Sequence, residues 1–171
     1  NIKSANPDII FAPSSITTAP LIIKQAREMG ITAVIAAGDT WENATIIENA
    51  GADAEGTVFS TFYDEAAPAN DEAAAFVDGF KAYLTSIGES DIIPAVSALG
   101  YDAYITAVQA IKDADSVDPA AIKDALKNVH VEGVTGDITF DENGDANKDM
   151  AYIKTIKDGK IVFLTTTSID E

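Results

Sequence analysis

The chain has 171 residues, enough for one domain or for parts of two small lobes, and its 47% hydrophobic and 23% charged residues are typical of a folded globular protein. With 28 Asp and Glu against 11 Lys and Arg, its formal net charge of -17 disfavours binding to nucleic acids and to anionic membrane surfaces. The absence of cysteine excludes disulfides, thiolate catalysis and cysteine-ligated metal.

Residues 1–62 alternate between short apolar runs and amphipathic stretches. The runs predict buried strands of a parallel sheet, and the stretches between them predict helices that end at glycines. We expect strands at 9–12, 33–37 and 57–62, and helices that end at Gly30 and Gly51. Strand, helix and strand at this spacing form a right-handed βαβ unit, so the exits of the first two strands open on the same edge of the sheet.

Both helices carry local signals for their first residues. The first is expected to begin at Thr17 or Thr18, with Pro20 in its first turn, and the second near Asn43. The predicted buried face of the first helix consists of Leu21, Ile22, Gln25, Ala26 and Met29.

From Asn70 to Val129 the sequence predicts three helices and no strand. A polar, Pro-containing stretch at 63–70 is typical of a crossover or linker. The helices are expected from Asn70 or Asp71 to Gly88, from 97 to 114, and after the cap Asp118-Pro119. Their predicted buried stripes are Phe76, Phe80, Leu84 and Ile87, then Tyr101, Ile105, Val108 and Ile111, then Ile122, Leu126 and Val129.

After Gly133 the apolar pattern changes to a period of two. It predicts a strand at 136–140, a turn at 141–145, and a hairpin of 151–157 with 160–166 around Asp158-Gly159. Three helices need more sheet to cover than three parallel strands and a hairpin provide. We therefore expect further sequence before Asn1, which is not an initiator Met, and a processed chain or a piece of a longer one.

Polar side chains follow the first two strands. In open parallel sheets, ligands bind beyond the carboxyl ends of the strands, so Asp39, Thr40 and Trp41 are candidate ligand-binding residues, and Asp39 could bind a ligand ammonium. Ser14 and Ser15 could donate hydroxyls to a ligand carboxylate. Each also has a structural alternative: a helix N-terminal acid for Asp39, a core side chain for Trp41, and helix caps for the two serines. Spacing leaves these alternatives open.

The sequence offers little for catalysis or for a bound cofactor. His130 is the only histidine, so neither a Cys/His pair nor a two-His metal site can form. The acidic segment 141–145 departs from a calcium-binding loop, which needs Gly and an acid where Ala146 and Tyr152 stand. No glycine-rich phosphate loop follows a strand. We expect no metal, no cofactor and no enzymatic activity.

Several segments, taken in order, resemble type I periplasmic-binding proteins, and within them the branched-chain amino acid (Leu/Ile/Val) binding proteins of ABC transporters. The resemblance covers nearly all of the chain. The segments are NPDIIFAP at 6–13, KQAREMGI at 24–31, GDTW at 38–41, AEGTVF at 54–59, ALGYDA at 98–103, GVTG at 133–136 and FDENGD at 140–145.

The family chain is about twice this long and has two α/β lobes joined by three crossovers, and this chain resembles its C-terminal half. The resemblance implies an α/β, periplasmic-binding-protein-like (type I) fold: a parallel sheet flanked by helices, plus a C-terminal β-hairpin, in a partial two-lobe arrangement. Residues 1–62 would be the later part of the second lobe (βαβαβ). Residues 63–134 would be helices of the first lobe, and 135–171 a β-rich tail that returns to the second lobe.

The resemblance also implies site residues. In the family, an acid at the position of Asp39 holds the α-ammonium of an amino acid, and the aromatic residue of the GYDA motif, here Tyr101, lies close to the cleft. Family members usually carry Gly-Tyr-Tyr after the first strand, where an aromatic residue reaches the ligand. Ser14, Ser15 and Ile16 stand there in this chain, so a branched-chain ligand is not assumed.

By resemblance, the function is that of the substrate-binding component of an ABC importer, binding a free amino acid (branched-chain or related) between two lobes. The implied partners are the amino acid, the permease membrane subunits, and the missing N-terminal half of the same chain or a second copy by element swapping. The implied location is periplasmic or extracellular, with a lipid anchor in the full-length protein as one form of attachment. The alternative is a ligand-sensing domain of a receptor or regulator for a small amino compound.

Overall fold

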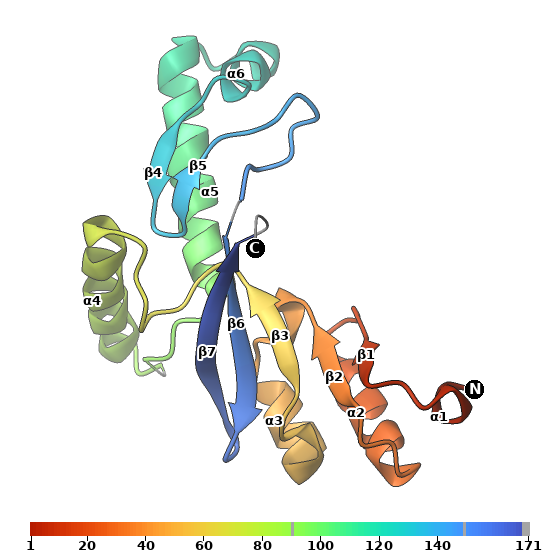
Figure 1. The fold of residues 1–171 in the computed structure, drawn as a ribbon. Coiled ribbons are helices and arrows are strands. Elements are labelled where there is room, and N and C mark those ends of the chain that lie inside the picture. Colours follow the sequence, from red (N-terminus) through yellow and green to blue (C-terminus); the bar gives the residue numbers. More distant parts are fainter. Residues whose placement is uncertain (90, 149, 169–171) are drawn as a thin grey trace. The chain divides into compact units, whose positions relative to one another are not determined.

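The computed structural model describes residues 1–168 except 90 and 149, and it divides into two compact units (Figure 1). The first, here called the sheet unit, comprises Asn1–Phe62 and 151–168. The second, called the helical unit, comprises Tyr63–Met150. Residues 135–150, which the sequence analysis groups with the tail, lie in the helical unit.

The sheet unit is built on a five-stranded sheet with the order β1-β2-β3-β6-β7. Its strands are β1 (Ile9–Phe11), β2 (Val34–Ala37), β3 (Val58–Thr61), β6 (Met150–Lys157) and β7 (Lys160–Ser168). The first three are parallel, whereas β6 runs antiparallel to β3. Asp158 and Gly159, both with positive φ, form the tight turn between β6 and β7. The three predicted parallel strands and the predicted hairpin are confirmed.

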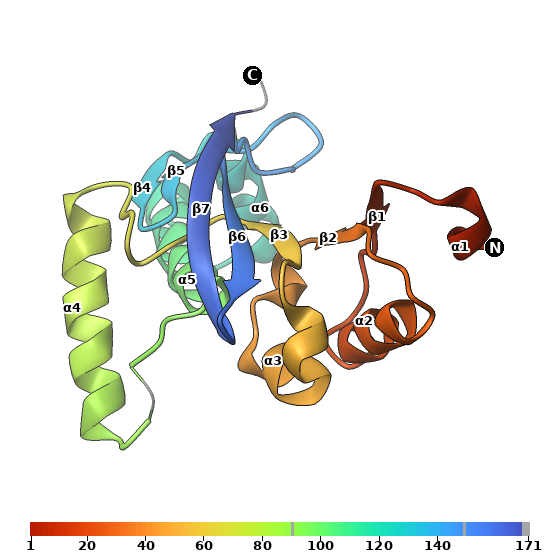
Figure 2. The ribbon, with the colours of Figure 1, turned by 60° about the horizontal axis from the view of Figure 1, so that its bottom comes forward.

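Two helices cover one face of this sheet, α2 (Ala19–Glu28) and α3 (Ala44–Ala50), and they lie on the same side of it (Figure 2). The side chain of Asn43 caps α3 by accepting from the backbone N–H of Thr45 at 2.9 Å. A four-residue helix, α1 (Ile2–Ala5), precedes β1. The core between helices and sheet includes Ile23, Ile35, Trp41, Ile46 and Phe59.

The buried face of α2 differs from the predicted one. Ile23 and Ala26 are buried together with the first turn, whereas Leu21 and Met29, predicted to face inward, are exposed. The helix carries apolar residues on two faces, so the pattern alone does not determine which face meets the sheet. Gln25 is exposed as well, so the prediction is wrong for Leu21, Gln25 and Met29.

The strand β1 is buried on only one side. Side chains alternate along a strand, so Ile10 packs against the core while Ile9 and Phe11 point away from the helices. Ile9 is 61% exposed and Phe11 is 69% exposed, and Val34, which pairs with Ile9, is exposed as well. The expectation that 9–12 is a buried strand is therefore wrong for one of its two faces.

The helical unit contains three helices and a small antiparallel sheet: α4 (Asp71–Ser86), α5 (Ala95–Ala114), α6 (Pro119–Leu126), β4 (Val131–Gly133) and β5 (Gly136–Ile138). Asn70 caps α4, and Asp118 caps α6 by accepting from two backbone N–H groups. The three helices are thus confirmed, and β5 is shorter than the predicted strand. None of the helices that the structure describes is both long and apolar enough to span a bilayer.

Helix α5 buries small and polar side chains in place of the predicted large ones. Its buried residues are Ala95, Ala98, Asp102, Thr106 and Ala110, whereas Tyr101 and Ile111 are exposed. The helix packs against α6 and β4, and small side chains allow a close approach between elements. A pattern of large apolar residues does not reveal such a face. On α4, Phe76, Phe80 and Leu84 pack as predicted, but Ile87 is exposed.

Candidate functional site

Parallel pairing of β1 with β2 brings the segments that follow them into contact, as the sequence predicts. The Thr40 hydroxyl and the Trp41 indole N–H both donate to the backbone carbonyl oxygen of Ser14, each at 3.1 Å. Two exits that lie 26 residues apart in sequence are therefore joined at the carboxyl edge of the sheet. This is the edge at which open parallel sheets bind ligands.

Asp39 begins a short 3-10 turn, Asp39–Trp41, directly after β2. Its backbone oxygen accepts from Glu42 N at 2.9 Å, which holds the turn closed. Its carboxylate is partly exposed and makes no hydrogen bond or ion pair with any residue that the structure describes. Asn43, and not Asp39, caps α3. The carboxylate is thus available to a cationic group at the edge of the sheet.

Trp41 and Thr40 hold the shape of this edge. Trp41 is 0% exposed and lies in the core of the sheet unit, so its ring is a core side chain in this structure. Thr40 is exposed, and its hydroxyl donates to the backbone carbonyl oxygen of Ser14. Both side chains therefore fix the position of the segment that carries Asp39.

The candidate residues Ser14, Ser15 and Ile16, which lie between β1 and α2, have different contacts. The Ser15 hydroxyl lies 2.9 Å from that of Thr17 and 3.1 Å from that of Thr18, so it organises the turn into α2. The Ser14 hydroxyl is buried and has no hydrogen-bond partner among the described residues. Ile16 packs against the core.

Tyr101 belongs to the helical unit, whereas the other candidates belong to the sheet unit. Its ring lies 5.0 Å from that of Phe76, which stacks on Phe80 at 5.3 Å. These rings line a groove of about 410 Å³ between α4 and α5, formed by Glu72, Ala75, Phe76, Gly79, Phe80, Tyr83 and Tyr101. Within the sheet unit, the structure therefore brings Ser14, Thr40 and Trp41 together, and within the helical unit Tyr101 lines the aromatic groove.

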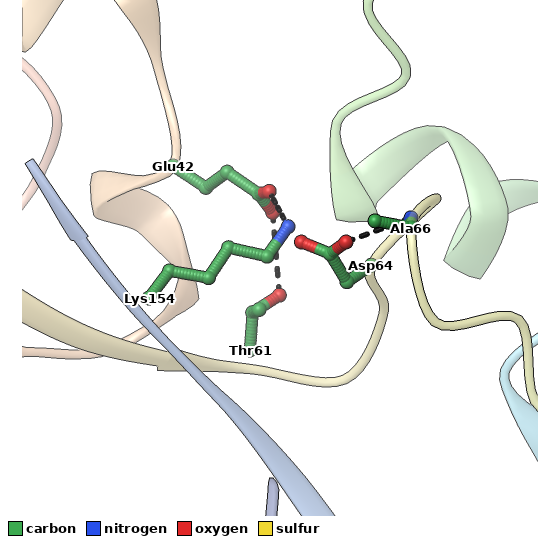
Figure 3. A network of polar contacts seen from close by, with 5 residues as sticks. All are labelled: Glu42, Thr61, Asp64, Ala66 and Lys154. Carbon is green, nitrogen blue, oxygen red and sulfur yellow. Dashed lines mark hydrogen bonds and ion pairs between the residues drawn. The ribbon is translucent and has the colours of Figure 1, made fainter. Parts of the chain in front are cut away.

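Sequence reasoning missed a buried polar cluster of Glu42, Thr61 and Lys154 (Figure 3). Lys154 of β6 forms an ion pair with Glu42, and Thr61 donates to the same carboxylate at 3.3 Å. The signal that could have found it is the alternation along β6, where Lys154 stands between the inward-facing Tyr152 and Ile156. A lysine at such a position needs a buried acid.

A second buried acid, Asp102, was quoted within the GYDA motif but given no role. Its carboxylate accepts from the backbone N–H groups of Val134 and Thr135, both at 2.8 Å, and from the Thr135 hydroxyl at 2.6 Å. It ties α5 to the turn between β4 and β5. Near the start of the helical unit, Asp64 accepts from Ala66 N at 2.8 Å, also drawn in Figure 3.

The acidic segment after β5 is a turn, as predicted. The carboxylate of Asp141 accepts from the backbone N–H of Asp145 at 2.9 Å and from that of Asn143 at 2.8 Å. These hydrogen bonds, that of Asp145 foremost, hold the pKa of the Asp141 carboxyl below its usual range. Within the described part of the chain, no three His, Cys, Asp or Glu side chains are grouped so that they could hold a metal ion.

Comparison with known proteins gives consistent matches. The family described as periplasmic binding protein matches residues 1–160. The leucine-, isoleucine-, valine-, threonine- and alanine-binding protein of Pseudomonas aeruginosa is 26% identical over 92% of this chain and 40% of its own length. The Leu/Ile/Val-binding protein homolog 3 of Brucella melitensis is 28% identical over 95% of this chain and 43% of its own.

Solved structures match to a similar extent. A leucine-binding protein from Thermotoga maritima is 36% identical, with a TM-score of 0.84 over 98% of this chain and 47% of that chain. A branched-chain amino acid transporter substrate-binding protein from Streptococcus pneumoniae, in complex with isoleucine, is 28% identical, with a TM-score of 0.75 over 95% of this chain and 44% of that chain. The chain thus spans less than half the length of these relatives.

Proposed function

Because the chain belongs to the periplasmic binding protein family, we propose that it is part of the substrate-binding component of an ABC importer and that it binds a free amino acid, branched-chain or related, between two lobes. The observation that carries the proposal is the Asp39 carboxylate, which has no described partner at the ligand-binding edge of the sheet. A carboxylate and an ammonium form a charge-assisted hydrogen bond, one of the strong kinds. The leucine and isoleucine named for the relatives support the choice of ligand.

We assign the candidate residues different roles. Asp39 binds the ligand ammonium, and Ser15 and Thr40 carry exposed hydroxyls in the two segments that follow β1 and β2. The hydrogen bond from the Trp41 indole N–H to the Ser14 carbonyl oxygen holds the segments after β1 and β2 together. Ile16 and Tyr101 remain candidate contacts for the ligand side chain.

The two units correspond, in this proposal, to parts of the two lobes. The chain passes between them at 62–63 and again at 150–151. Closure of two lobes on a ligand by hinge motion at such crossovers is an established type of conformational change, and the closed form would dock on the permease subunits.

We further propose that more protein covers the exposed apolar surfaces of this chain: the N-terminal half of a longer chain, or a second copy that swaps elements. The relatives are more than twice as long as the matched part, which supports the first of these occupants. The uncovered face of β1, with Ile9 and Phe11, and the aromatic groove of the helical unit are the surfaces concerned.

The proposed location is the periplasm or the outer cell surface. A net charge of -17 gives these 171 residues no electrostatic attraction to anionic lipids, so attachment to a membrane would come from another part of a longer protein, for which we propose a lipid anchor. Membrane fractionation tests this: an anchored protein is released by detergent and is retained in high salt.

The function is tested by thermal shift and calorimetry on the longest natural chain that contains these residues. We expect leucine, isoleucine or valine to raise the melting temperature by mass action. We expect 4-methylpentanoic acid, which is leucine without its amino group, to have no effect. If no free amino acid shifts the melting temperature, the proposal is wrong.

A further inference from the structure

We propose that the buried Glu42–Lys154 pair is a positioning device, which fixes the segment 39–42 on the sheet and so places the Asp39 carboxylate. Its importance for ligand binding rests on the proposed function, whereas its effect on the segment does not. Neither residue is among those that the family resemblance or the strand exits singled out.

The pair lies deep in the sheet unit. The side chains of Lys154 and Glu42 are 4% and 8% exposed. Lys154 pairs with Phe59 across β6 and β3, and therefore points to the face of the sheet that the helices cover. Figure 3 shows its ammonium and the hydroxyl of Thr61 directed at the carboxylate of Glu42.

Glu42 is the residue through which the 3-10 turn continues into α3. Its backbone N–H donates to Asp39, and the next residue, Asn43, caps the helix. Three backbone hydrogen bonds close this short stretch: Trp41 N to Gly38 O at 3.1 Å, Glu42 N to Asp39 O at 2.9 Å, and Asn43 N to Trp41 O at 2.8 Å. A displacement of Glu42 would therefore move Asp39.

The segment is held from two sides. Thr40 and Trp41 bind Ser14, which follows β1 at one edge of the sheet. Glu42 is bound by Lys154 of β6, which lies beyond β2 and β3 in the strand order. Without Lys154, the segment would lose its attachment to β6.

A charged pair is a costly way to stabilise a core. Replacing a buried ion pair by apolar side chains of similar size is often neutral or stabilising, so the presence of such a pair is weak evidence for a role in stability. A pair of charges does, however, accept only a narrow geometry. The Glu42–Lys154 pair lies beside the ligand-binding edge, which favours a role in fixing the position of Asp39. A binding site loses affinity when the contacts that support it loosen.

The test uses a double variant, Glu42→Gln with Lys154→Met, in the longest natural chain. It removes both charges with little change in side-chain volume. The amide oxygen of the new glutamine can still accept the hydrogen bond from the Thr61 hydroxyl. Hydrogen exchange by mass spectrometry then reports on the amides of Trp41, Glu42 and Asn43. We expect these amides to exchange at least about tenfold faster than in the wild type, while peptides from α2 and from the 158–159 turn are unchanged.

The control is the matching double variant of an exposed pair, Asp124→Asn with Lys127→Met, whose side chains are 70% and 63% exposed. It should leave the exchange of 39–43 as in the wild type. As a rescue, the exchanged pair Glu42→Lys with Lys154→Glu keeps the combined side-chain length and should restore slow exchange. Exchange in 39–43 that stays at the wild-type rate in the folded Gln/Met variant would overturn the proposal.

Amino acid affinity, measured on the same proteins, separates the two proposals. We expect the Gln/Met variant to bind at least about tenfold more weakly with its melting temperature retained, a combination that a purely structural pair would not produce. Faster exchange with unchanged affinity supports the positioning role of the pair and removes Asp39 from the ligand site. If the wild type binds no amino acid, the exchange rates alone decide the inference.

Discussion

Removing the Asp102 carboxylate is expected to destabilise the helical unit strongly. Asp102 is 3% exposed and accepts three hydrogen bonds, from two backbone N–H groups and one hydroxyl of the segment 134–135. These bonds attach the small antiparallel sheet to α5. In Asp102→Ala, both N–H groups lose their acceptor inside the protein.

The magnitude follows from what is left unpaired. A buried donor without a partner costs about 1–3 kcal/mol, so two of them give about 2–6 kcal/mol. We expect a loss of about 4 kcal/mol in the free energy of unfolding, a large part of the roughly 5–15 kcal/mol that keeps a domain folded. Thr135→Val removes only the hydroxyl bond and should cost less.

Urea unfolding followed by far-UV circular dichroism measures this loss, because α4 to α6 contribute much of the helical signal. Trp41, the one tryptophan, reports on the sheet unit by fluorescence in the same experiment. The control is Asp113→Ala, an exposed acid on the same helix, which should change stability by no more than about 0.5 kcal/mol. A loss below about 1 kcal/mol for Asp102→Ala would refute the reasoning.

Three further changes probe other contacts. Gly133→Ala would place a Cβ 2.6 Å from Ile138 Cδ1 and 2.7 Å from Asp102 Oδ1, so we expect a loss of about 1–3 kcal/mol by chemical denaturation, whereas no loss would mean that the contact relaxes freely. Thr106 has a buried hydroxyl without a partner among the described residues, so Thr106→Val should raise stability by about 1 kcal/mol, and a lower stability would contradict this. The 171-residue chain alone should self-associate through the exposed face of β1, and Phe11→Ser should reduce this association in sedimentation velocity; equal association of both forms would argue against it.

The order of elements could be predicted because its signals are local. Apolar runs mark the strands, Asn43, Asn70 and Asp118 mark helix starts, and Asp158-Gly159 marks the hairpin. The contact between the exits of β1 and β2 also follows from sequence, because parallel strands with one crossover helix leave no other arrangement.

What could not be predicted depends on residues that are distant in sequence. Glu42 and Lys154 are 112 residues apart, and nothing near Glu42 indicates a partner. The buried faces of α2 and α5 are set by the elements that pack on them, so α5 buries Asp102 and exposes Tyr101. Trp41 shows the same limit, since its spacing allowed both a ligand contact and a core side chain.

The most direct test of the account is the affinity of Asp39→Ala for the amino acid that the wild-type full-length protein binds, measured by calorimetry. Asp8→Ala is the matched control, because Asp8 precedes β1 and so lies at the opposite edge of the same parallel sheet. Leaving a buried ligand ammonium unpaired costs roughly 2–5 kcal/mol, so we predict at least tenfold weaker binding for Asp39→Ala and unchanged binding for Asp8→Ala. Equal affinity of Asp39→Ala and wild type would contradict the claim that this carboxylate holds the ligand.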